Sequence, residues 1–107
     1  KFHVDMDGKK IIITKDIFND DALILSEYKS KAVTLKSDNH NRTIKFNFDS
    51  PLLGIWAKPG ASYVCIEPWW GVNDNHDKKP DISEKRAIMS LESEKSKSFN
   101  WNIEICE

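Results

Sequence analysis

Hydrophobic and polar residues alternate with a period of two along several short stretches of the chain. The clearest stretches are 98–105 and 43–48, in which every second side chain is large and apolar. Such alternation is typical of a β-strand that has one buried and one exposed face. Further strands are predicted where β-branched and aromatic residues gather, at 11–14, 22–28, 32–36, 52–57 and 62–66.

Turn-forming residues separate these stretches. Asp7 and Gly8 predict a tight turn, and residues 37–41 and 58–60 predict two more. Gly54 interrupts an apolar stretch and predicts a bulge or a close approach by another group. About seven short strands joined by polar turns predict an all-β fold, an antiparallel β-sandwich or barrel.

The pattern weakens in the last third of the chain. Residues 71–80 are polar and rich in Asn and Asp, which predicts a long surface loop. Residues 82–94 alternate between weak helical and weak strand signals, and we expect a short strand at 87–91. Because long loops are uncommon in small domains, the loop at 71–80 is itself a candidate functional segment.

The composition fits one small domain. The 107 residues carry 16 Lys and Arg against 17 Asp and Glu, a formal net charge of −1. This balance argues against a nucleic-acid partner. No apolar run approaches the roughly 20 residues of a membrane-spanning helix, and the N-terminus lacks the apolar segment of a signal peptide, so no membrane contact is expected. We therefore expect a cytoplasmic protein, with Cys65 and Cys106 as two reduced, half-buried thiols.

The sharpest local feature is a carboxylate between a thiol and an indole. On a strand over 63–71, Tyr63, Cys65, Glu67 and Trp69 share one face. Apolar neighbours disfavour an ionised carboxylate and can raise its pKa into the range useful for proton transfer. Indole faces are also surfaces on which sugar rings pack. The alternative is a water-exposed Glu at the end of a strand, beside two tryptophans of the core.

A metal site and a histidine-based catalytic site are both weakly supported. Asp74, His76 and Asp77 lack the spacing of a calcium loop or a zinc site, so no metal site is predicted. A solvated loop tip is the simpler interpretation. His3 and His40, like His76, stand in polar surroundings without an evident orienting partner, which gives no support for a catalytic dyad or triad.

Two further candidates have simple structural interpretations. Asp20 and Asp21 precede an apolar stretch and are expected in the turn that introduces a strand, although one of them could project into a site. Trp56 lies within an apolar stretch and is expected in the core. Pattern alone therefore assigns neither position a ligand.

Four ordered stretches of the sequence resemble the aldose 1-epimerase (galactose mutarotase) family. The stretch that carries most of the resemblance is YVCIEPW at 63–69, followed by SEKR at 83–86. Three upstream stretches agree in order, FNDDALI at 18–24, AVTLKS at 32–37 and LGIWAKPG at 53–60. The resemblance is strongest to the mutarotase-like branch that accompanies lactose operons, and it extends over about residues 17–105.

The resemblance implies a β-supersandwich that interconverts the α and β anomers of a free aldohexose without a metal or nucleotide cofactor. In the family, a carboxylate general base takes the proton of the anomeric hydroxyl, and a histidine general acid protonates the ring oxygen. By position, Glu67 matches the general base and Asp21 matches the sugar-binding aspartate. The resemblance also implies Trp56 and Trp69 as walls of the sugar pocket.

The resemblance is incomplete in one respect that bears on activity. The family's histidine acid lies upstream of the stretch that contains Asp21, in a segment absent from this sequence, and His3, His40 and His76 do not match it. Family enzymes are also much longer, so residues 1–107 resemble the C-terminal portion of such a domain. We expect these residues alone to have little or no mutarotase activity, and cut sheet edges to allow a homo-oligomer to form.

Two other classes of function stay open at this stage. The first is a carbohydrate-binding protein that keeps a sugar cleft without catalysis. The second is a β-sandwich interaction domain whose tryptophans belong to the core. A sugar-dependent change in tryptophan fluorescence would distinguish a sugar cleft from the interaction domain.

Overall fold

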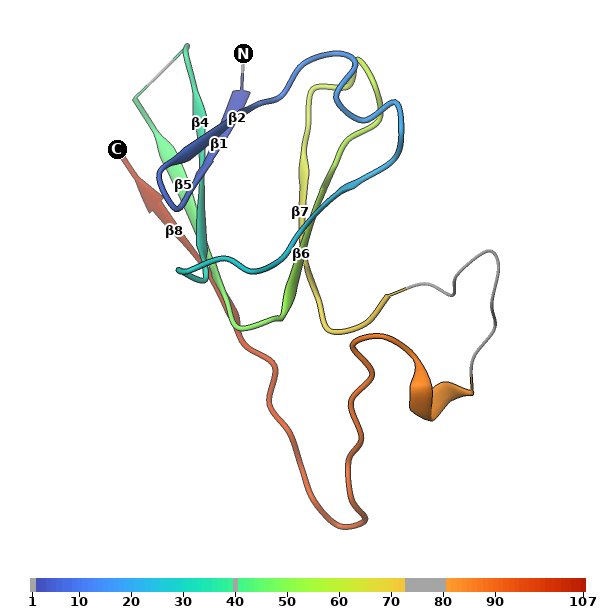
Figure 1. The fold of residues 1–107 in the computed structure, drawn as a ribbon. Coiled ribbons are helices and arrows are strands. Elements are labelled where there is room, and N and C mark those ends of the chain that lie inside the picture. Colours follow the sequence, from blue (N-terminus) through green and yellow to red (C-terminus); the bar gives the residue numbers. More distant parts are fainter. Residues whose placement is uncertain (1, 40, 73–80) are drawn as a thin grey trace.

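The expected all-β fold is confirmed. The computed structural model describes residues 2–39, 41–72 and 81–107 of the chain. They form eight β-strands and a 3₁₀ helix at Ile82–Glu84. The strands build two antiparallel sheets that face each other as a β-sandwich (Figure 1).

The two sheets differ in width. The larger sheet has the strand order β2-β1-β4-β5-β8 and consists of β1 (Phe2–Met6), β2 (Lys9–Ile12), β4 (Ala32–Ser37), β5 (Thr43–Phe48) and β8 (Trp101–Cys106). The smaller sheet has the order β3-β6-β7 and consists of β3 (Leu23–Leu25), β6 (Leu52–Trp56) and β7 (Cys65–Trp69). The structure thus has one strand more than the approximately seven that the pattern predicts.

The core lies between the sheets and follows from the period-two pattern. Side chains that point inward from alternate positions of β1, β4, β5 and β6 are buried. Val4 and Val33 come from the larger sheet, Leu53 and Ile55 come from β6, and all four are fully buried. Such side chains each contribute roughly 1.5–3 kcal/mol by leaving water, so this layer is the main source of stability.

A tight hairpin connects β1 and β2, as the Asp7–Gly8 dipeptide predicts. Asp7 has φ 50° and Gly8 has φ 78°, the left-handed pair that a type I′ turn requires. No strand is predicted before this turn, and the observed β1 corrects that omission. Phe2, Val4 and Met6 alternate there with two polar residues. The strand therefore shows the period-two pattern of hydrophobic and polar residues, but over only five residues.

The Asp7 carboxylate also connects the β1–β2 hairpin, by hydrogen bonds, to residues 29 and 30, which precede β4. It accepts backbone hydrogen bonds from Lys29 N–H at 2.7 Å and Ser30 N–H at 2.9 Å, and a third hydrogen bond from the Ser30 hydroxyl. The hydrogen bonds from Ser30 and Lys29 lower the pKa of Asp7 below its usual value. The ionised carboxylate is therefore the form that stabilises the fold.

Replacing Asp7 by Ala should lower stability by an amount that depends on pH. Because the pKa of Asp7 is lower in the folded chain, its contribution is fully present above the unfolded value of about 3.9 and is lost as pH falls through the folded value. Urea unfolding should show a gap between wild type and Asp7→Ala that is constant from pH 7 to 5 and shrinks below pH 4. A gap that stays constant to pH 2 would contradict this assignment, and Asp16→Ala, at another exposed carboxylate, is the control.

The predicted strand at 87–91 is wrong. That segment forms no strand, and Ala87 has φ 60°, a left-handed conformation that ends an extended strand. Among the described residues, no strand pairs with this segment. Weak alternation alone was therefore insufficient to predict a strand, because a strand also needs a partner with which to pair.

Four other strands have boundaries that differ from the predicted ones by two residues or more. The strand predicted at 11–14 is β2 at Lys9–Ile12. The smaller sheet uses 65–69 rather than 62–66, because the register sets Cys65 opposite Trp56 at the end of β6. The stretch 22–28 contains only β3, and Glu27 beyond it has φ 58°. The last strand starts at Trp101 rather than 98.

A side chain explains the late start of β8. Both oxygens of the Asp49 carboxylate accept the Asn100 N–H, at 3.1 and 3.2 Å, and one also accepts the Asn100 amide at 3.0 Å. A carboxylate thus takes the place of the carbonyl acceptor that strand pairing would supply. The same hydrogen bonds lower the pKa of Asp49.

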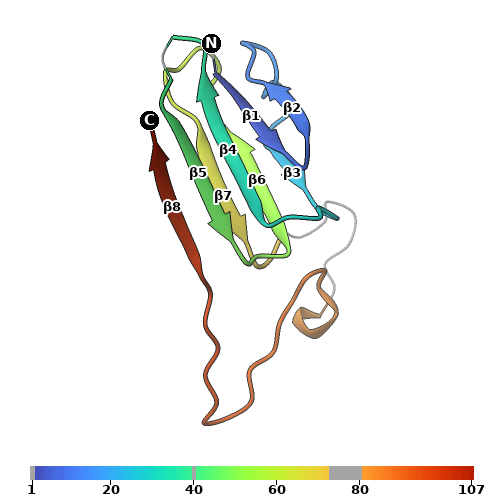
Figure 2. The same cartoon turned by 90° about the vertical axis from the view of Figure 1, so that its left-hand side faces the viewer.

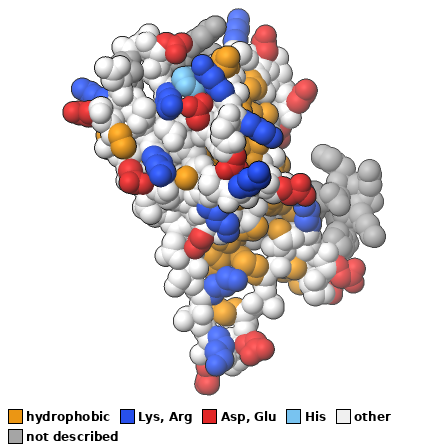
Figure 3. All heavy atoms as spheres, turned by 60° about the vertical axis from the view of Figure 1, so that its left-hand side comes forward, with side chains coloured by type: hydrophobic (Ala, Val, Ile, Leu, Met, Phe, Trp, Pro, Cys, Tyr) orange, Lys and Arg blue, Asp and Glu red, His pale blue; other side chains and the backbone are white. Residues whose placement is uncertain are grey.

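Both cysteines are free, but they differ in exposure. Cys65 on β7 is half-buried, as expected, whereas Cys106 on β8 is exposed. The prediction of a half-buried thiol is thus wrong for Cys106, which lies at the end of an edge strand and is exposed in the part of the chain that the structure describes. Among the described residues, no helix is long and apolar enough to cross a membrane. Lys and Arg are interspersed with Asp and Glu on the face in Figure 3, in line with the balanced charge.

Candidate functional site

The outward face of the smaller sheet carries the predicted carboxylate. Ile66 packs against the core, and both Ile66 and Pro68 line a hollow between the two sheets. Because side chains alternate along a strand, Cys65, Glu67 and Trp69 point to the opposite face. The predicted sharing of one face is therefore confirmed for these three residues, and each of them is half-buried. Tyr63, predicted on the same face, precedes the strand and is exposed.

An indole holds the Glu67 carboxylate in place. Trp69 Nε1 donates a hydrogen bond to Glu67 Oε1 at 3.1 Å. The residues are two apart on β7, so both side chains leave the strand on the same side. One oxygen of Glu67 is therefore held by a neutral donor, and its second oxygen makes no hydrogen bond to Trp69. A carboxylate of this kind can accept a proton, or a hydrogen bond from a sugar hydroxyl.

Gly54 explains why the indole can lie there. It is directly opposite Glu67 in the β6–β7 pairing, and a Cβ at position 54 would lie 2.8 Å from Trp69 Cε2 and 2.9 Å from Trp69 Nε1. The indole thus fills the space that any other side chain would need. The predicted close approach at Gly54 is confirmed.

Replacing Gly54 by Ala should displace the Trp69 indole and break its hydrogen bond to Glu67. The tryptophan emission spectrum should change, because the indole loses the place that it occupies over Gly54. Gly71→Ala is a matched control, because a Cβ at position 71 meets no atom within 4 Å. An unchanged emission spectrum in Gly54→Ala would contradict the described packing.

Trp56 lies close to this pair but belongs partly to the core. It is opposite Cys65 in the β6–β7 ladder, one step along the outward face from the Gly54–Glu67 pair. It is half-buried and packs against the core cluster. The structure thus supports the core interpretation of Trp56 and also places it beside the carboxylate.

Asp21 lies in the turn before β3, as the residue pattern predicts. Its carboxylate accepts the N–H of Ala22 at 2.8 Å, and the residue is exposed. Leu23, two residues later, pairs with Ile55, so Asp21 lies near the end of β6 that carries Trp56. Its φ of 85° is uncommon for a residue other than glycine. The described interactions do not join Asp21 to Glu67, which lies on a different strand of the same sheet.

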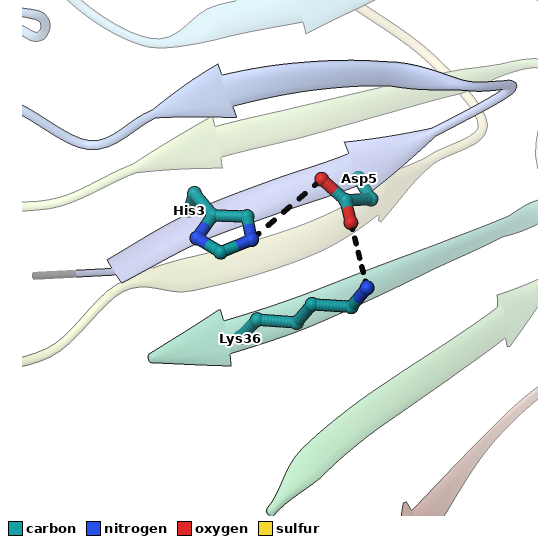
Figure 4. Close-up of polar contacts among 3 residues, drawn as sticks. All are labelled: His3, Asp5 and Lys36. Carbon is teal, nitrogen blue, oxygen red and sulfur yellow. Dashed lines mark ion pairs between the residues drawn. The ribbon is translucent and has the colours of Figure 1, made fainter. Parts of the chain in front are cut away.

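His3 belongs to a different polar group, shown in Figure 4. Its Nε2 atom is 3.8 Å from Asp5 Oδ1, and the other oxygen of Asp5 is 2.9 Å from Lys36 Nζ. Val4 between them is buried in the core, so this group faces away from the core on the outside of the larger sheet. Glu67 faces outward from the other sheet, and the whole sandwich therefore separates it from His3.

This second group escaped the sequence analysis because β1 was missed. Alternation along 2–6 places Asp5 on the same face as His3, but their separation of 3.8 Å is longer than a hydrogen bond, so Asp5 does not orient the ring through one. As a partly exposed ion pair, Asp5–Lys36 contributes about 0–1 kcal/mol. His40 and the set Asp74, His76 and Asp77 lie outside the described residues, so their interpretation stays a prediction.

Comparison with curated proteins finds the plasmid and chromosomal forms of Protein LacX from Lactococcus lactis subsp. lactis. Each is 27% identical to this chain over 100 residues, which is 89% of this chain and 33% of LacX. The chain is similar to LacX. It spans about a third of the length of these relatives. No protein family and no solved structure gives a significant match.

The similarity to LacX includes the candidate site. A continuous match over 89% of the chain must include Asp21, Trp56, Glu67 and Trp69, wherever in the chain it begins. It also includes all three strands of the smaller sheet. The outward face of that sheet is therefore within the part of the chain that is similar to LacX.

Proposed function

We propose that this chain carries the general-base half of a site that opens and closes the ring of a free aldose, as an aldose 1-epimerase (mutarotase) does. The observation that carries the proposal is the half-buried Glu67 carboxylate with one oxygen fixed by Trp69 Nε1 at 3.1 Å. The similarity to LacX over most of the chain supports a role in sugar metabolism. The substrate we propose is an aldohexose, and the chemistry requires no cofactor.

In this proposal Glu67 is the base and an acid outside these residues is its partner. Glu67 takes the proton of the anomeric hydroxyl, and the electron pair of that O–H bond forms the carbonyl at C1. The bond between C1 and the ring oxygen breaks, and the ring oxygen takes a proton from the acid. After rotation about C1–C2 the ring oxygen bonds to C1 again and returns its proton to the acid, while the carbonyl oxygen takes back the proton that Glu67 holds.

The other predicted residues have supporting roles in the proposal. Trp69 is a positioning residue, because its indole N–H is used to orient Glu67. Trp56, beside Cys65 on the same face, supplies a flat apolar wall for the sugar ring. Asp21 binds a sugar hydroxyl through its exposed carboxylate. Its left-handed backbone conformation supports such a role, since strained residues gather at functional sites.

We also propose that the two sheets are part of a larger galactose mutarotase-like supersandwich, of which residues 1–107 form the C-terminal portion. The length of LacX supports this, because two thirds of LacX have no counterpart in the match. The missing acid would then come from that larger part.

A non-catalytic carbohydrate-binding protein is the second candidate function. It is favoured by the position of His3, which lies on the outer face of the opposite sheet and therefore cannot serve as the acid for Glu67. Both candidates use the same face for the sugar. They differ in whether an acid faces Glu67 in the complete protein.

A polarimetric assay with a fluorescence titration tests the proposal on the 107-residue chain. We expect α-galactose and α-glucose to mutarotate at their spontaneous rates, because the base alone lacks its partner acid. We also expect one of these sugars to change the tryptophan emission. Rapid mutarotation would contradict the placement of the acid outside the chain, and an unchanged emission with every aldose would contradict a sugar site on this face.

A further inference from the structure

The larger sheet extends beyond the smaller one and leaves an apolar face uncovered. In Figure 2, β8 stands at the edge of the larger sheet, and no strand of the smaller sheet lies behind it. Trp101, Ile103 and Ile105 alternate along β8 and have exposed fractions of 57%, 52% and 73%. The Trp101 ring packs against buried Phe46 at 5.9 Å between centroids, so this is the inner face of β8, the side that would normally be core.

A groove runs between this face and β7. Its volume is about 480 Å³, and eight apolar side chains from β4, β5, β7, β8 and the residue before β7 line it. Phe46 and Ile66 belong both to the groove and to the packed core. The groove is thus an unfilled continuation of the core, open at the side where the smaller sheet ends at β7.

The shape and chemistry of this surface favour a β-strand as its occupant. Apolar residues at every second position of β8 repeat about every 6.6 Å, which is the spacing of inward side chains on another strand. A strand laid beside β7 would widen the smaller sheet and cover Ile103 and Ile105. A sugar would find no polar side chain among the residues that line the groove.

We propose that this β7–β8 groove binds strands of the remaining two thirds of a LacX-type chain. The argument is that LacX is about three times as long as the match and that the uncovered face is continuous with the core. The proposal rests on the larger sandwich proposed above, and not on the sugar chemistry. Strands that bind beside β7 would also lie next to Glu67, at the place from which an acid could reach the same sugar.

The test is co-expression of this chain with the part of Lactococcus lactis LacX that lies outside the match, followed by light scattering on a sizing column. We expect a one-to-one complex in the absence of sugar. Ile103→Lys should weaken the complex at least tenfold, since it places a charge in an apolar interface. Glu104→Lys, on the opposite face of the same strand, should leave the complex unchanged. Ile105→Lys, at a more exposed position, repeats the test with less risk to folding.

Three results would overturn the proposal. The first is a folded, monomeric chain that forms no complex with the LacX segment. The second is a self-association of the 107-residue chain that Ile103→Lys abolishes, which would assign the groove to a second copy. The third is a complex that tolerates both Ile103→Lys and Ile105→Lys. Because complex formation is measured without sugar, none of these results depends on whether Glu67 is a base.

Discussion

Replacing Glu67 by Gln is expected to lower kcat for mutarotation about 10²-fold or more, in a full-length LacX-type protein that carries this segment. Gln keeps the size of the side chain and retains an oxygen that can accept the Trp69 indole N–H, which in the wild type donates to Glu67 at 3.1 Å. It cannot take a proton at neutral pH. The loss should therefore appear in kcat, with little change in KM, because sugar binding is retained.

A matched substitution separates this loss from a general effect of removing a carboxylate. Glu104 lies on β8, where its side chain accepts a hydrogen bond from Asn47 on the outer face of the larger sheet. Glu104→Gln should leave kcat within about twofold of wild type. A wild-type rate in Glu67→Gln would remove Glu67 from the role of base, and unchanged sugar binding would then favour the non-catalytic alternative.

Replacing Leu53 by Ala is expected to destabilise the fold by about 2–5 kcal/mol. Leu53 is fully buried and lies on β6, the central strand of the smaller sheet, so its truncation leaves a cavity in the core. A small domain has a total stability of only about 5–15 kcal/mol. The midpoint of thermal unfolding should therefore fall by about 8 °C or more, which circular dichroism can measure.

The same substitution at an exposed leucine provides the control. Leu91 is 58% exposed in the long connection between β7 and β8, and Leu91→Ala should change stability by less than about 0.5 kcal/mol. If Leu53→Ala were as mild as Leu91→Ala, the assignment of β6 to the core would be wrong.

Strict alternation made several strands predictable from the sequence alone. The strand Thr43–Phe48 was predicted to the residue, because Phe46 and Phe48 are both buried on one face. Alternation at 87–91 predicted a strand that does not form, and no strand pairs with that segment among the described residues. Alternation was overlooked at Phe2–Met6, although the tight turn that follows marks the end of a strand. Local pattern thus establishes which face a strand would bury, and pairing decides whether the strand forms.

The candidate site was predictable in composition but not in detail. Period two alone places Glu67 and Trp69 on one face. Their hydrogen bond depends on the rotamer of the indole, and that rotamer depends on Gly54 lying opposite Glu67 in the β6–β7 register. Register between strands is a long-range property that no single stretch of sequence contains. The sequence could therefore indicate a close approach at Gly54 without identifying the group that approaches.

The most direct test of the account is an NMR titration of the ¹⁵N-labelled chain with galactose and with glucose. The indole N–H signal of Trp69, assigned from the spectrum of Trp69→Phe, reports the group that donates to Glu67. We expect a saturable shift of this signal with at least one of the sugars. We expect no such shift for Trp101, which lies on the inner face of β8 in the other sheet. A Trp69 signal that stays fixed throughout both titrations would contradict a sugar site at Glu67.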